Sequence, residues 1–80
     1  MLLSTKIKLT NGAVLCYEYN SLLDRHSVSY RHGCAEGFWM KFVKKPGEII
    51  NLIAPYRDGN PEVCELIAWL SEQAKLPRYA

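Results

Sequence analysis

The chain has few of the features that mark a known class of functional site. Its three cysteines, Cys16, Cys34 and Cys64, are odd in number and irregularly spaced, which argues against a disulfide-bonded scaffold. Ten basic and eight acidic residues leave a formal net charge of only +2, too small to indicate a polyanionic partner by itself. No apolar run approaches membrane-spanning length, and residues 1–3 lead directly into polar residues rather than into a signal-peptide core. We therefore expect a cytoplasmic protein without membrane contact.

Motifs of catalysis and metal binding are equally scarce. The chain has no glycine-rich phosphate loop, no His-Glu metal pair and no nucleophile elbow. His26, His32 and Cys34 lie close together in sequence, but a zinc site would need its fourth ligand from Cys16 or Cys64, which belong to distant segments. Cys34 as a nucleophile with a histidine base would lack an orienting carboxylate. We expect no metal, no cofactor and no enzymatic activity.

The clearest feature that the chain does have is Asn11-Gly12, set between two runs of alternating side chains. Asn-Gly favours a two-residue type I′ turn, because both central positions of that turn need positive φ. We expect a β-hairpin of residues 3–9 and 14–19. Since 49% of the residues are hydrophobic, the 80 residues should form a single globular domain, residues 1–80.

Further elements follow along the chain. Residues 26–31 and 38–44 are predicted to be a third and a fourth strand. Residues 47–54 are ambiguous: Ile49, Ile50, Leu52 and Ile53 fit one helical face, but three isoleucines before Pro55 fit a buried strand, which we favour slightly. Residues 61–75 should be a helix, with Asn60 as its N-cap and an apolar stripe along one side. The expected fold is α+β, an antiparallel sheet of four to five strands with one C-terminal helix on one face.

The turn type would determine which side chains share a face of this sheet. A two-residue turn pairs Thr10 with Ala13, and therefore Leu9 with Val14 and Ile7 with Cys16. The face under the helix then carries Leu3, Ile7, Leu9, Val14, Cys16, Phe38, Met40 and Phe42, with Leu66, Ile67 and Leu70 packed against it. The outer face carries Lys6, Lys8, Leu15, Tyr17, Tyr19, Trp39, Lys41 and Val43. Should Tyr17 and Trp39 prove necessary for folding, a helix at residues 47–54 would cover that face instead.

The outer face is the predicted binding surface, because exposed aromatic rings and lysines are typical of interaction sites. The expected contact residues are Lys6, Lys8, Tyr17, Tyr19, Trp39 and Lys41, with Trp69 on a separate helix edge, unless the C-terminal tail or a loop covers Trp69. We expect a small protein-binding module that acts stoichiometrically as a regulator or inhibitor, of the kind found among phage and mobile-element accessory proteins. The alternative is a single-stranded nucleic-acid-binding domain, since lysines can meet phosphates while rings stack on bases. The oligomeric state is not predicted.

Overall fold

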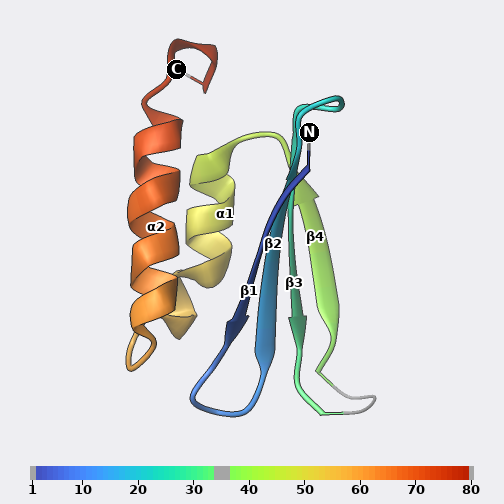
Figure 1. The fold of residues 1–80 in the computed structure, drawn as a ribbon, viewed down its shortest axis with the longest axis vertical. Helices are drawn as coiled ribbons and strands as arrows, with labels where there is room; N and C mark the ends of the chain where they lie inside the picture. Colours follow the sequence, from blue (N-terminus) through green and yellow to red (C-terminus); the bar gives the residue numbers. More distant parts are fainter. Residues whose placement is uncertain (1, 34–36, 80) are drawn as a thin grey trace.

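The computed structural model describes residues 2–33 and 37–79 of the chain. Within them, four strands form an antiparallel sheet in the order β1-β2-β3-β4, and two α-helices lie together on one side of it (Figure 1). The α+β class is as predicted, but the layer over the sheet contains two helices rather than one. The elements are β1 Leu2–Lys8, β2 Val14–Asn20, β3 Arg25–Arg31, β4 Trp39–Val43, α1 Pro46–Ile53, η1 Ala54–Tyr56, α2 Pro61–Ala74 and η2 Pro77–Tyr79, where η marks a short 3₁₀ helix.

Helix α1 corrects the prediction of a strand at residues 47–54. Pro46 occupies the first helical position, and the Glu48 carboxylate accepts a hydrogen bond from the Lys45 backbone N–H at 3.3 Å. Ile49 and Ile53 are four residues apart, so they lie on the same helical face, and both are fully buried. Burial of this face outweighs the strand propensity of isoleucine, because propensity contributes only tenths of a kcal/mol per residue.

Helix α2 begins at Pro61 as predicted and buries Val63, Leu66 and Leu70 along one side. Asn60 holds the N-cap position, but its side chain does not cap the helix. Its Oδ1 instead accepts a hydrogen bond from the backbone N–H of Thr10 at 2.9 Å. The start of α2 is therefore tied to the turn between β1 and β2, fifty residues earlier in the chain.

The turn between β1 and β2 is one residue longer than predicted. The Leu9 N–H donates to the Ala13 carbonyl at 2.8 Å, and the Gly12 N–H donates to the Leu9 carbonyl at 3.0 Å. These bonds enclose a three-residue loop in which Gly12 has a φ of +89° while Asn11 keeps a negative φ. The Asn11 side chain accepts a hydrogen bond from the Ala13 N–H at 2.9 Å, so Asn11 stabilises the turn with its amide oxygen.

The longer turn shifts the β1–β2 register by one residue, so the β2 side chains lie on the opposite faces of the sheet from those predicted. Ile7 pairs with Leu15 rather than with Cys16. Because side chains alternate along a strand, Leu15 and Tyr17 face the helices, while Val14 and Cys16 face the other way. The predicted faces of β2 are therefore wrong. The core between sheet and helices consists of Ile7, Leu9, Ala13, Leu15, Tyr17, Val28, Ile49, Ile53, Val63, Leu66 and Leu70.

The predicted faces of β4 are also reversed. Trp39 pairs with Tyr30, and the two rings stack 5.8 Å apart at 7° on the side of the helices. Val43, on the same side, packs against the core. Met40 and Phe42 consequently lie on the side away from the helices and are exposed to solvent. The expected packing of Leu70 against Phe42 does not occur.

Candidate functional site

The face of the sheet turned away from the helices combines exposed apolar and charged side chains. In Figure 1 both helices lie on the other side, so among the described residues no helix covers it. We call this surface the open face. Its side chains follow from the strand register and alternation: Ser4, Lys6 and Lys8 from β1, Val14, Cys16 and Glu18 from β2, Arg25, Ser27, Ser29 and Arg31 from β3, and Met40 and Phe42 from β4, with Phe38 just before it.

Three large apolar side chains form a stripe along one edge of the open face. Phe38, Met40 and Phe42 expose 53%, 45% and 54% of their surfaces, and we call them the apolar stripe. The Arg25 guanidinium lies 4.6 Å from the ring centre of Phe42, and the Arg31 guanidinium lies 5.2 Å from that of Phe38. Arginine, methionine and aromatic residues are the types enriched in protein interfaces.

The charge of the open face is predominantly positive. Among its described residues there are four cations, Lys6, Lys8, Arg25 and Arg31, and one carboxylate, Glu18. A hollow of about 370 Å³ on this face is lined by Lys6, Val14, Cys16, Ser29, Arg31 and Phe38. The described residues of its lining include no carboxylate. The surface therefore favours a ligand with negative groups next to apolar ones.

The predicted lysines of β1 lie where they were expected, and the tyrosines of β2 do not. Lys6 and Lys8 are exposed on the open face. Tyr17 is only 1% exposed and belongs to the core. Tyr19 lies on the same side as Tyr17, where its hydroxyl donates to the Asp24 carboxylate at 3.0 Å. The register shift removes both tyrosines from the binding surface.

Two further residues of the predicted surface lie on the helix side of β4. Trp39 is partly covered and stacks on Tyr30. Lys41 is exposed, but it lies beside α1 and lines a shallow hollow with Glu48 and Asn51. As anticipated for a fold in which residues 47–54 are helical, α1 covers the side that carries Trp39 and Tyr17.

Trp69 lies on α2, separate from the open face, as predicted. It is 39% exposed, and its ring meets the Tyr17 ring edge-on at 6.0 Å and 65°. The C-terminal tail contacts a different side chain, because the Tyr79 ring packs on His26 at 5.7 Å. Trp69 is therefore partly exposed, with Tyr17 as one of the side chains against it.

The residues of the open face that sequence reasoning missed include its arginines and its apolar stripe: Arg25, Arg31, Phe38, Met40 and Phe42. A signal for them was present in the third and fourth strands. Pairing the aromatic residues Tyr30 and Trp39 across the hairpin would have placed both on one face, since such cross-strand pairs stabilise sheets. Arg31 and Phe38 would then have followed on the opposite face.

A chain of hydrogen bonds around buried His26 is the other concentration of polar groups. The Tyr17 hydroxyl donates to Nδ1 of His26 at 2.7 Å, and Nε2 lies 3.0 Å from the Tyr79 hydroxyl, which donates to Asp24 at 3.1 Å. With Nδ1 as an acceptor, the proton of the neutral ring sits on Nε2 and is donated to Tyr79. Every member of the chain has a partner, so the network holds the tail and the β2–β3 turn against the sheet.

The pKa values of this network follow from burial and hydrogen bonding. Burial lowers the pKa of His26, with a nearby Arg78 acting in the same direction and Asp24 against it. Burial also raises the pKa of Tyr17. Hydrogen bonds from Tyr19 and Tyr79 lower the pKa of Asp24, while burial and its bond to Asp24 raise the pKa of Tyr79 to about 12. Near neutral pH the network is thus held by neutral His26 and ionised Asp24.

Residues 2–33 and 37–79 contain no cluster of three or more His, Cys, Asp or Glu side chains that could hold a metal. Cys34, considered above as a ligand or nucleophile, lies outside the described residues. None of the described helices is long and apolar enough to cross a membrane.

The chain matches no family model, no curated protein and no solved structure. Function must therefore be inferred from the surfaces themselves, and the open face offers the clearest combination of exposed apolar area and uncompensated charge.

Proposed function

We propose that this protein is a non-catalytic binding module whose open face binds a protein partner. The partner presents an apolar patch surrounded by acidic side chains, and binding is stoichiometric, as for a regulator or inhibitor. The observation that carries the proposal is the apolar stripe, in which three large side chains remain about half exposed on a folded domain. Contiguous exposed apolar patches bordered by charge are typical of interaction sites.

The stripe offers a useful amount of binding energy. A phenylalanine covers roughly 150–250 Å² when fully buried, so Phe38 and Phe42 would each contribute on the order of 100 Å² of newly covered apolar area. At about 25 cal/mol per Å², each ring would supply about 2.5 kcal/mol before the costs of association. The two arginines beside the rings already restrict them, which lowers the entropic cost of binding.

The four cations of the open face determine which partner fits. Lys6, Lys8, Arg25 and Arg31 would steer an acidic protein surface toward the sheet and raise the association rate. Single-stranded nucleic acid also carries negative charge, but its usual sheet receptors present aromatic rings on central strands. The central strands β2 and β3 present aliphatic, serine and charged side chains on the open face, Arg25 and Arg31 among them, but no aromatic ring, and the rings are confined to the β4 edge. A protein partner is therefore the better fit.

We further propose that the protein acts in the cytoplasm. Cys16, which is partly exposed on the open face, is a free thiol, as is exposed Cys64. Thiols of this kind persist in reducing compartments, where disulfides are rare.

The experiment compares matched pairs of apolar substitutions. Met40→Ser with Phe42→Ser removes apolar side chains from the stripe, and Leu22→Ser with Leu23→Ser removes them from the exposed β2–β3 turn. Proteins are captured from nuclease-treated lysate of the native cells, identified, purified and titrated against each variant. We expect at least a tenfold loss of affinity for the stripe variant and less than a twofold change for the turn variant, with both still folded.

Two results would reject the proposal. One is a partner that binds the stripe variant as tightly as the wild-type protein. The other is binding to a mixed oligonucleotide that is lost with Lys6→Glu and weakens steeply with salt, because that behaviour indicates contacts to phosphates.

A further inference from the structure

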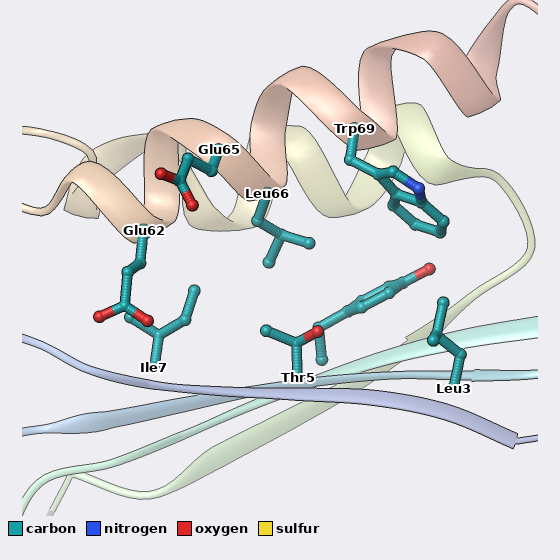
Figure 2. A pocket seen from close by; sticks show the side chains of 8 residues that line it. Leu3, Thr5, Ile7, Glu62, Glu65, Leu66 and Trp69 are labelled. Carbon is teal, nitrogen blue, oxygen red and sulfur yellow. The ribbon is translucent and has the colours of Figure 1, made fainter.

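A second surface, separate from the open face, is the groove between the edge strand β1 and helix α2. Among the described strands β1 pairs only with β2, so the backbone groups along its other edge are unpaired. Above this edge, β1 and α2 enclose a groove of about 290 Å³. Figure 2 shows Leu3, Thr5 and Ile7 rising from β1 toward the side chains that descend from α2. The groove thus runs alongside a free strand edge.

The two ends of the groove differ in chemistry. At one end Glu62 and Glu65 of α2 lie near Ile7, and at the other end Trp69 lies above Leu3 (Figure 2). Trp69 and Leu3 are 39% and 38% exposed, so the apolar end is partly open. Helix α2 packs mainly on α1 and η1 rather than on the strands.

Among the residues that the structure describes, no lysine or arginine lines the groove. Among the described residues the one ion pair of α2 joins Glu72 to Lys75 at 3.2 Å and involves neither Glu62 nor Glu65. The two carboxylates lie near the positive end of the helix, which stabilises them, but they remain available to a cationic group.

We propose that the groove binds an extended basic peptide, which adds to the sheet as a strand along the free edge of β1. Main-chain hydrogen bonds to β1 would supply affinity, and alternate side chains entering the groove would supply specificity. A lysine or arginine of the peptide meets Glu62 and Glu65, and a large apolar side chain packs on Trp69. Leu3 and Ile7 are four residues apart, about 13 Å along a strand, so these two peptide positions are also four residues apart.

The test is selection of random peptides displayed on phage, with three forms of the protein as bait. These are the wild-type chain, the double variant Glu62→Gln with Glu65→Gln, and the control Glu72→Gln on the same helix. We expect the wild-type protein and the control to enrich peptides with a basic residue four positions from a large apolar one. The double variant should bind those peptides about tenfold more weakly, since each exposed charge pair contributes roughly twofold to fivefold in affinity.

Fluorescence locates the bound peptide. In a Trp39→Phe background Trp69 is the remaining tryptophan, and its emission should change as a selected peptide is added. Amide hydrogen exchange of β1 should slow at the same time, because an added strand protects the amides at the free edge. The stripe variant Met40→Ser with Phe42→Ser should bind the peptide normally, so failure of the groove and failure of the open face are distinguishable.

The remaining outcomes would overturn the proposal. Selected peptides that lack a basic residue, or that bind the double variant as well as the wild-type protein, would show that the carboxylates do not select the ligand. Changes in Trp69 emission with protein concentration alone would assign the groove to a second copy of the chain. Peptide binding that disappears in the stripe variant would place the peptide on the open face.

Discussion

We expect His26 to make the fold sensitive to acid, because its side chain is buried and hydrogen-bonded. Its ring is 2% exposed, and each nitrogen is hydrogen-bonded to a tyrosine hydroxyl. Protonation would convert Nδ1 from an acceptor into a donor and displace the hydroxyl proton of Tyr17, for which no other acceptor is placed among the described residues. Protonation of the His26 ring is therefore less favourable in the folded protein than in the unfolded chain.

We expect stability to fall as the pH is lowered below about 6.5, the ordinary pKa of histidine. The pKa of His26 is lowered in the folded protein, so between this lowered value and 6.5 the unfolded chain binds more protons and unfolding becomes easier. Asp24, whose pKa is also lowered, adds a second loss of stability below its usual pKa of about 4. Urea unfolding measured from pH 7.5 to 5.0 tests the first of these windows.

The two histidines provide the control for this measurement. His26→Gln should flatten the pH dependence of the free energy of unfolding between pH 6.5 and 5.0, whereas His32→Gln, at an exposed position, should leave it unchanged. An equally steep dependence in the His26 variant would assign the acid sensitivity to other groups.

Among the elements, the β1–β2 turn needs a glycine for its backbone conformation, whereas helix α1 does not. Gly12 has a φ of +89°, where a β-branched side chain is strained, although no atom lies within 4 Å of the added Cβ position. Gly12→Val should therefore cost about 1–3 kcal/mol in the free energy of unfolding. Gly47, in α1, also has open space around it but no positive φ, so Gly47→Ala should stabilise the protein by about 0.5–1 kcal/mol.

Thermal or urea unfolding of both variants shows whether each substitution lowers or raises the free energy of unfolding. A destabilised Gly47→Ala variant would mean that α1 does not hold its helical backbone in solution. A Gly12→Val variant as stable as the wild-type protein would argue against the three-residue loop.

The elements were predictable where a local signal was strong. The helix from Pro61 was found because an N-terminal proline and an apolar stripe agree on its start and its buried side. The strand regions were found because their side chains alternate. In both cases the residues themselves carry the information within a short window.

The faces of the sheet were not predictable in the same way. Asn11-Gly12 is compatible with loops of two or three residues, and the difference of one residue decides whether Tyr17 is exposed or buried. Phe42 was placed in the core because it is apolar, whereas its pairing with Ser27 puts it on the open face. Register depends on contacts between distant segments, so a short window cannot determine it.

At the scale of the whole molecule, two surfaces of opposite charge lie on different sides of one core. Of the residues in the described ranges 2–33 and 37–79, the open face carries four cations and one carboxylate, while the β1–α2 groove carries two carboxylates and no cation. The protein could therefore join an acidic partner to a basic peptide without the two competing for the same residues, even though its net charge is only +2.

Both surfaces depend on the same core, and Leu70 tests that dependence. Leu70 is fully buried, so Leu70→Ala should lower the free energy of unfolding by about 2–5 kcal/mol. Leu22 is 88% exposed in the β2–β3 turn, so Leu22→Ala should change the free energy of unfolding by less than about 0.5 kcal/mol. Urea unfolding of both variants measures the difference. Similar values for the two leucines would contradict the packing of α2 over the sheet.

The position of both helices after the last strand has a consequence for synthesis on the ribosome. The sheet is complete at Val43, but its buried side is covered by residues that continue to Leu70. At about 5–20 residues per second, the intervening 27 residues take roughly 1–5 s to translate. A nascent sheet that forms before α1 and α2 have left the ribosome would have no layer over Ile7, Leu15 and Tyr17, and we expect chaperones to bind these apolar side chains at that stage.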